Sequence, residues 1–190
     1  KASQGDGLKL AEQVGANVIN LDDIQLHPGG TPKTGIMSSW PSGRNRIFLT
    51  PQGDRFVNED AARDTLCKAV FKEGGKYWIV SNHVKYPTLD YQSKNLTIGE
   101  MIKLGQAFSG NTIEELAQKT GMDPKKLRAS IDTYNDVVTG KIKEDNLGFK
   151  KFTQDDKPMT EGPFYATPMV PAVHHTMGGI QINSAAQVLD

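Results

Sequence analysis

Residues 174–183 read His-His-Thr-Met-Gly-Gly-Ile-Gln-Ile-Asn, and the fold and function that we expect of the chain follow from this stretch. Two imidazoles precede a pair of glycines, and the alternation of Ile180 and Ile182 with polar residues is typical of a strand. Because Gly178 and Gly179 have no Cβ atom, a backbone can approach a ligand closely there. A neighbouring imidazole can donate a hydrogen bond to an anionic group. The stretch therefore predicts a segment that contacts an anionic ligand.

Composition narrows the class of protein. The 190 residues suit one domain, or one domain with pieces of another. The formal net charge of zero gives no electrostatic case for binding nucleic acid or an anionic membrane. No apolar run approaches the roughly 20 residues that span a bilayer. Cys67 is the only cysteine, so neither an internal disulfide nor a cysteine metal site is expected, and we interpret it as a partly buried helix residue.

The ends of the chain indicate a piece of a larger polypeptide. The sequence has neither a starting methionine nor a secretory signal, and it opens at a predicted helix and stops just after a predicted strand. We therefore expect further chain on both sides and leave its compartment open, as either the bacterial cytoplasm or the cell envelope.

Start signals and periodicity predict the helices. Thr97 is expected to cap a helix over 97–108, Thr112 to form a capping box with Glu115, and Asp123 to cap a helix that runs to about Val138. Further helices are predicted over 5–15 and over 61–72, the latter with Asn58 or Asp60 as its cap.

Alternating patterns predict the strands. They cover 17–26, a hairpin of 47–50 with 55–57, a buried strand over 77–80 and an extended segment over 164–173. Residues 29–46 and 141–162 are expected to be loops. The fold class is therefore α+β.

Six segments together resemble the fumarate reductase and succinate dehydrogenase flavoprotein superfamily. The resemblance is closest to soluble fumarate reductases, of the flavocytochrome c type, and to urocanate reductase-like proteins. The segments that carry it are Gly5-Asp6-Gly7-Leu8, Gln25-Leu26-His27-Pro28, Gly53-Asp54-Arg55-Phe56-Val57-Asn58-Glu59, Arg63-Asp64, Thr112-Ile113-Glu114-Glu115-Leu116-Ala117 and His174-His175-Thr176-Met177-Gly178-Gly179.

The resemblance implies a division of the chain and a cofactor. Residues 1–26 would be a fragment of an FAD-binding domain, 27–163 a capping domain over the substrate, and 164–190 a return into the FAD-binding domain. FAD would be the cofactor, contacted by Gly5, Asp6, Gly7, Thr176, Met177, Gly178 and Gly179. The fingerprint Gly-x-Gly-x-x-Gly is absent, so we expect the chain alone to bind FAD weakly or not at all.

The resemblance also implies a substrate site. His27 and His175 would hold a substrate carboxylate, and Arg63 would be the general acid that delivers a proton. Met37 would line the pocket, and the hydroxyl of Ser39 would contact the substrate. No metal is expected.

Each of these residues has a plainer structural interpretation. His27 could be a strand-end histidine bonded to the backbone, and Met37 could pack in a core. Arg63 could be a surface residue paired with Asp60 or Asp64. We expect His174 to be structural.

The sequence departs from the fumarate reductases in the predicted proton relay. Trp40 and Gly43, or Ser42 in place of Gly43, occupy the positions of a glutamate and an arginine, and Arg44 and Arg46 are possible substitutes. Trp40 favours an acid bulkier or less charged than fumarate, such as an aryl acrylate, unless it merely packs beneath the loop.

The expected function is part of an FAD-dependent reductase of α,β-unsaturated carboxylates. Its partners would be a small unsaturated carboxylic acid, the rest of the FAD-binding domain, and an electron-donor domain with haem or FMN. The alternatives are a non-catalytic lid or interaction module, and a dehydrogenase of the same superfamily that works in the oxidising direction.

Overall fold

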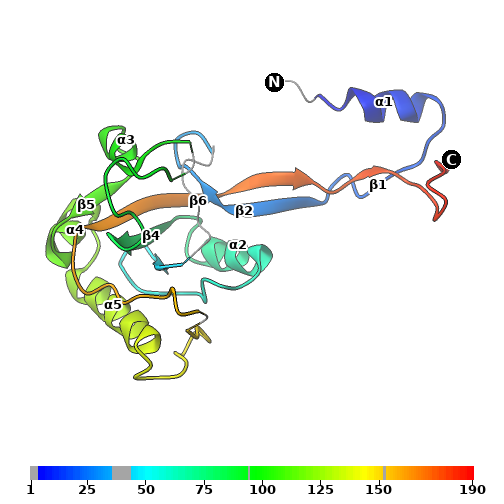
Figure 1. Ribbon diagram of the computed structural model, residues 1–190. Helices are drawn as coiled ribbons and strands as arrows, with labels where there is room; N and C mark the ends of the chain where they lie inside the picture. Colours follow the sequence, from blue (N-terminus) through cyan, green and yellow to red (C-terminus); the bar gives the residue numbers. More distant parts are fainter. Residues whose placement is uncertain (1–3, 36–43, 94, 152) are drawn as a thin grey trace. The chain divides into compact units, whose positions relative to one another are not determined.

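The computed structural model describes residues 4–35, 44–93, 95–151 and 153–190. The chain forms two compact units, which are considered separately below (Figure 1). The first unit comprises residues 1–26 and 173–190, and the second comprises residues 27–172. The mixture of helix and sheet confirms the predicted α+β class.

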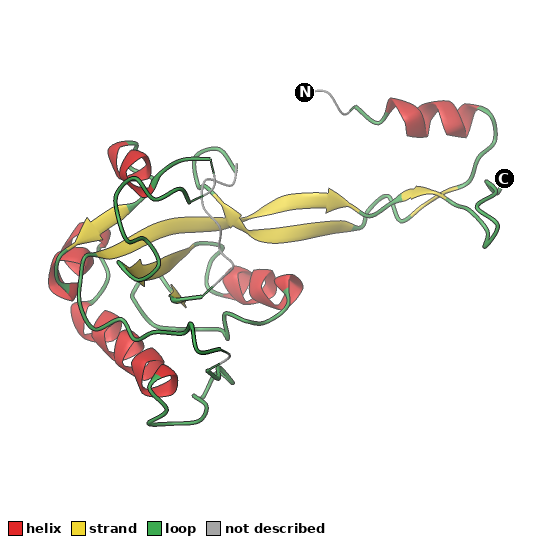
Figure 2. Cartoon of the chain, in the orientation of Figure 1, coloured by secondary structure: helices red, strands yellow, loops and turns green. Residues whose placement is uncertain are grey.

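A five-stranded sheet organises the second unit (Figure 2). Its strand order is β2 (Ile24–Gly30), β6 (Phe164–Thr176), β4 (Tyr77–Asn82) and β3 (Arg46–Leu49). β5 (Phe108–Gly110) also pairs with β6. Because the first three residues of β6 pair with both β4 and β5, these two strands lie on opposite edges of β6.

Alternate side chains of β3 belong to two different core clusters, and each cluster contains different helices. Ile47 and Leu49 belong to a core cluster with α4 (Ile113–Thr120) and α5 (Pro124–Val138). Phe48 belongs to a second cluster with α2 (Arg63–Lys72). Successive side chains of a strand point to opposite faces, so helices cover both faces of the sheet.

A third cluster surrounds α3 (Ile98–Lys103) and includes Tyr86 and Tyr165. Tyr165 follows Phe164 on β6 and points to the other face from it, since Phe164 belongs to the cluster around α4 and α5. The second unit therefore has a complete core of its own.

Local capping chemistry confirms three of the predicted helix starts. Asp123 accepts hydrogen bonds from the backbone of Lys125 and Lys126, and α5 ends at Val138 as expected. Thr97 and Glu100 form a full capping box at α3. Thr112 caps α4, but the carboxylate of Glu115 accepts from the backbone of Asn111 rather than from that of Thr112.

Two helix predictions were wrong at one end. α3 stops at Lys103 instead of Phe108, because Gly105 adopts a positive φ of 67° and Phe108 enters strand β5. α2 begins at Arg63, and its N-cap, Ala62, has no side-chain capping bond. Asn58 accepts from the backbone of Asp60 in a turn, so neither caps the helix.

Two strand predictions also need correction. The hairpin of 47–50 with 55–57 is reduced to one isolated bridge between Leu49 and Arg55, because β3 pairs along its length with β4. The strand predicted over 17–26 is interrupted at Asn20, whose φ is 56°, and divides into β1 (Val18–Ile19) and β2. β2 also continues to Gly30, into the predicted loop.

The first unit consists of α1 (Asp6–Gln13), β1 and β7 (Gly179–Ile180), with β1 and β7 antiparallel. None of its described residues is buried. The large apolar side chains that it leaves exposed are Leu10, Val14, Ile19, Leu21, Ile24, Val173, Met177, Ile180, Ile182 and Val188. Exposed apolar surface of this extent is typical of a face that packs against more protein.

The compact units do not follow the predicted domain limits throughout. The second unit continues to Ala172, beyond the limit at residue 163, because the start of β6 is an interior strand of its sheet. The assignment of the units to a capping domain and an FAD-binding domain remains a prediction.

One buried ion network joins three parts of the second unit. The guanidinium of Arg55 donates two hydrogen bonds to the carboxylate of Glu59, at 2.9 and 2.7 Å, and one to Asp145 at 2.5 Å. All three side chains are at most 4% exposed. Burial alone would lower the pKa of Arg55, but the bonds and charges of Glu59 and Asp145 outweigh it and raise this pKa. Glu59 also accepts from the backbone of Phe48, so the network is tied to β3.

Replacing Arg55 tests the contribution of this network to stability. In Arg55→Met, two buried carboxylates lose their cation, and we expect the free energy of unfolding to fall by about 3–5 kcal/mol. Arg128→Met removes an exposed pair with Glu114 and should leave the free energy of unfolding nearly unchanged. Urea denaturation followed by circular dichroism measures both, and equal losses would contradict the assigned role of the network.

Candidate functional site

The predicted flavin contacts around the double glycine lie at the end of β6 and the start of β7. Thr176 and Met177 are exposed, and the backbone N–H of Met177 donates to the carbonyl of Asp23 at 2.9 Å. Gly178 and Gly179 follow, with Gly179 paired to Ile19. This segment is therefore fixed within the first unit by backbone bonds.

The two glycines differ in what surrounds them. A Cβ on Gly178 would lie 2.5 Å from the carbonyl oxygen of Asn20, whereas a Cβ on Gly179 would meet nothing within 4 Å. Gly178 is thus required by packing inside the unit. Gly179 keeps an open backbone, as the sequence analysis expected of both.

The other predicted flavin contacts lie where α1 begins. Gly5 is the N-cap with a φ of 76°, and Asp6 stands in the first turn, where the helix dipole favours a carboxylate. A Cβ on Gly7 would meet nothing within 4 Å. All three residues are exposed.

His27 is a buried residue of β2, with 5% of its surface exposed. The backbone N–H of Gly29 donates to Nδ1 of His27 at 3.1 Å. This is the backbone bond that the structural interpretation predicts. Because Nδ1 accepts, the neutral ring carries its proton on Nε2, which is the nitrogen that can donate.

Arg63 is the first residue of α2, and its side chain is exposed. Asp60, one of the partners considered for it, bonds Arg44 at 2.8 Å. The first N–H groups of a helix have no intrahelical acceptor, and the N-cap of α2 provides no side-chain bond. A guanidinium beside such N–H groups forms a position that attracts anions.

Arg44 and Arg46, the candidate substitutes in the proton relay, differ in environment. Arg46 is buried, donates to the carbonyl of Glu59 at 2.9 Å, and lies 5.2 Å from the ring centre of Phe48. Burial lowers its pKa. Arg44 is partly exposed and lies between the carboxylates of Asp60 and Asp156, at 2.8 and 3.6 Å. Arg44 is therefore the more exposed of the two and the closer to the carboxylate of Asp60, from which Arg46 lies 3.9 Å away.

Lys85 adds a titratable group that the sequence did not reveal. Its ammonium donates to the carbonyl of Arg44 at 3.2 Å. Burial, followed by repulsion from Arg46, lowers the pKa of Lys85 to about 8. No motif marks Lys85 in the sequence, because its environment is created by β3 and by the turn after β4.

Five of the residues considered for substrate contact or proton relay lie outside the described residues. These are Met37, Ser39, Trp40 and Gly43, together with the alternative Ser42. Their predicted roles therefore remain predictions.

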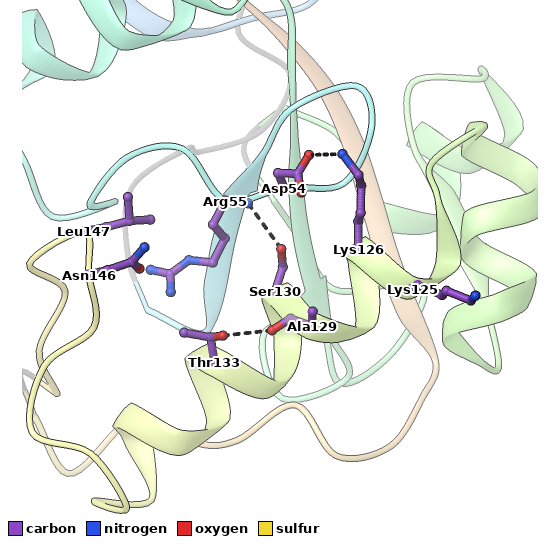
Figure 3. A pocket seen from close by; sticks show the side chains of 9 residues that line it. All are labelled: Asp54, Arg55, Lys125, Lys126, Ala129, Ser130, Thr133, Asn146 and Leu147. Atoms are coloured by element: carbon purple, nitrogen blue, oxygen red, sulfur yellow. Dashed lines mark hydrogen bonds and ion pairs between the residues drawn. The ribbon is translucent and has the colours of Figure 1, made fainter.

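Among the clefts on the described part of the second unit, two are lined by none of the predicted site residues. One, of about 360 Å³, is lined by residues around the start of α5, including Arg55, Lys125 and Ser130 (Figure 3). In this cleft, Lys126 pairs with Asp54 at 2.7 Å, and the backbone N–H of Arg55 donates a hydrogen bond to the hydroxyl of Ser130. The other, of about 520 Å³, lies beside α3.

The described part of the chain contains neither a metal-binding cluster nor a membrane-spanning helix. Within it, no group of three or more histidine, cysteine, aspartate or glutamate side chains could hold a metal ion. No helix within those same ranges is long and apolar enough to cross a membrane.

The difference between the two glycines is testable in the full-length protein. We expect Gly178→Ala to destabilise it by about 1–3 kcal/mol, since the added methyl meets the backbone of Asn20. Gly179→Ala should stay within about 0.5 kcal/mol. Thermal unfolding distinguishes them, and an unchanged melting temperature in Gly178→Ala would refute the close contact.

Lys85 predicts a pH dependence of stability. Between about pH 8 and 10.5 the unfolded chain holds the lysine proton and the folded chain has lost it, so the free energy of unfolding should rise with pH. Lys85→Met should remove this rise, whereas Lys141→Met, which changes an exposed lysine, should keep it. Urea denaturation at several pH values measures the difference. A rise that persists in Lys85→Met would show that another group causes it.

Comparison with known proteins places the chain in a family. A family model described as an FAD binding domain matches residues 1–190. An NADH:acrylate oxidoreductase from Vibrio harveyi is 35% identical over 191 residues, which are 97% of this chain and 18% of that protein. An NADH:fumarate oxidoreductase from Klebsiella pneumoniae (strain 342) is 34% identical over 193 residues, which are 100% of this chain and 20% of that protein.

Structural comparison agrees with this placement. The open conformation of a flavocytochrome c3 fumarate reductase superposes with a TM-score of 0.71 at 30% identity, over 99% of this chain and 32% of that one. The chain spans about a fifth of the length of the two oxidoreductases above. It belongs to the FAD binding domain family and resembles the part of the fumarate reductase flavoproteins that these alignments cover.

Proposed function

We propose that this chain is part of an FAD-dependent oxidoreductase that reduces the C=C bond of an α,β-unsaturated carboxylate. The observation that carries the proposal is its similarity, over nearly its whole length, to reductases named for acrylate and for fumarate. Both acids have a double bond conjugated to a carboxylate. In this proposal the second unit is a capping domain over the substrate.

The residues predicted to contact the cofactor fit a flavin. Gly7 and Gly179 present backbone with open space where a Cβ would stand, which a planar ring system can approach. The exposed apolar side chains of the first unit supply surface for packing against the remainder of an FAD-binding domain. When bound and reduced by the electron donor, FAD would supply the hydride for the reduction.

The proposed substrate residues divide into two histidines that bind the carboxylate and an arginine that acts on the double bond. Nε2 of His27 and a ring nitrogen of His175 donate hydrogen bonds to the carboxylate, which holds the acid in place. Arg63 stabilises the negative charge that develops as hydride reaches one carbon, and it delivers a proton to the neighbouring carbon. Hydride and proton together saturate the double bond.

An arginine is an unusual acid, because its guanidinium hardly loses a proton in proteins. The start of α2 supports the role. The guanidinium stands at the first turn of the helix, beside backbone N–H groups without an intrahelical acceptor, so together they can stabilise the negative charge that develops on the substrate. Arg44, between Asp60 and Asp156, is our candidate to return a proton to Arg63.

The identity of the acid and of the electron donor belongs to the proposal as well. Trp40 favours an aryl acrylate such as cinnamate over fumarate. A haem or FMN domain is the proposed donor. Two alternatives remain: a non-catalytic lid or interaction module, and a dehydrogenase that oxidises saturated acids.

The test uses the full-length protein with reduced methyl viologen and a panel of fumarate, acrylate, urocanate and cinnamate. We expect turnover of at least one acid, and in Arg63→Gln a loss of about 10²–10⁴-fold with FAD still bound. Arg128→Gln, which changes an exposed arginine of α5, is the matched control and should leave turnover unchanged.

Three results would count against the proposal. Near-normal turnover in Arg63→Gln would refute the acid role. Oxidation of saturated acids with no reduction of the panel would favour the dehydrogenase. Absence of both activities in a protein that holds FAD would favour the lid or interaction module.

A further inference from the structure

Two adjacent histidines at the end of β6 have their rings in contact. The ring centres of His174 and His175 are 3.9 Å apart, with the ring planes inclined by 55°. Neighbouring side chains of a strand normally point to opposite faces. The contact therefore requires at least one ring to turn over the edge of the strand, and strand geometry alone does not hold it there.

A side chain of the neighbouring strand fixes one of the two rings. Nδ1 of His174 lies 3.2 Å from Oε1 of Gln25, a partly buried residue of β2. An amide oxygen only accepts hydrogen bonds, so His174 carries a proton on Nδ1 and donates it to Gln25. This bond sets the rotation of the His174 ring, against which His175 packs. All three residues belong to the first unit.

We propose that Gln25 is a positioning residue for the histidine pair. By holding His174 in one orientation, it supplies the surface against which the ring of His175 rests, and so directs a ring nitrogen of His175 at the substrate carboxylate. The inference rests on the proposed function, in which His175 binds that carboxylate. In this inference Gln25 orients His174, and His174 supports the ring of His175 without contacting the substrate itself.

Orientation of a donor affects binding more than chemistry. If His175 holds the carboxylate equally in the ground state and the transition state, a misdirected ring raises KM and leaves kcat nearly unchanged. A general loss of structure would instead lower kcat and flavin content together. The ratio of the two constants therefore separates positioning from a merely structural role.

Three substitutions in the full-length flavoprotein test the role of Gln25. Gln25→Met keeps the length of the side chain and removes the acceptor, and Gln25→Asn keeps the amide but withdraws it by one methylene. Each should raise KM for the acid that the protein reduces about tenfold, with kcat within about threefold. Gln25→Glu keeps an acceptor at the same distance, so KM should stay within about threefold of the wild-type value.

A fourth variant separates this inference from the proposed function. His175→Gln should raise KM by at least as much, and Gln25→Met in that background should add nothing. A normal KM in His175→Gln would overturn the assignment of His175 and the positioning role with it. A raised KM in His175→Gln, with Gln25→Met and Gln25→Asn normal, would overturn the positioning role alone. Gln25→Glu as impaired as Gln25→Met would also overturn it, because the acceptor would then be irrelevant.

Discussion

The buried guanidinium of Arg55 is the interaction on which the second unit depends. It bonds Glu59, four residues further along the chain, and Asp145, which lies ninety residues away, and it stacks 5.1 Å from the ring centre of Phe149. Asp145 in turn accepts from the backbone of Leu147 and Phe149. A segment without helix or strand is thereby ordered against β3. The effect of such a network on stability is largest when one member is removed, because a buried charge without its partner strongly destabilises the folded protein.

The two units differ in how far their own residues stabilise them. The second has three core clusters around one sheet, whereas the described residues of the first include no buried side chain. Backbone bonds hold the first unit locally, as between Asn17 and Gln181. Its apolar side chains are little buried within the unit. Because burying a large aliphatic side chain stabilises a fold by about 1.5–3 kcal/mol, the unit lacks most of this stabilisation. The proposal that the first unit packs against more of an FAD-binding domain would account for this, and the relatives reported above are several times longer than the chain.

Sequence reasoning succeeded where the decisive contact is local. Asp123 and Pro124 fix the start of α5 within four residues, so the sequence predicted it correctly. The hairpin failed because β3 takes its partner, β4, from about thirty residues away. In the site, one of the two interpretations of His27 was a hydrogen bond with the backbone. The structure has this bond, and its donor is only two residues from His27 along the chain. The partners of Lys85 and Gln25 come from other strands and turns, and no spacing in the sequence reveals them.

The second unit contains a lysine with a lowered pKa, Lys85, which raises the question of why an arginine would donate the proton. Lys85 has a pKa of about 8, close to the value that favours proton transfer near neutral pH. Its ammonium, however, is buried and bonded to the carbonyl of Arg44. A proton donor must come within hydrogen-bond reach of the reacting carbon, so geometry takes precedence over pKa. Arg63 is exposed at the start of α2, where its fixed charge can meet an anion before any proton moves. The exposed residue is therefore suited to contact with the substrate, and the buried lysine to holding in place the backbone that carries Arg44.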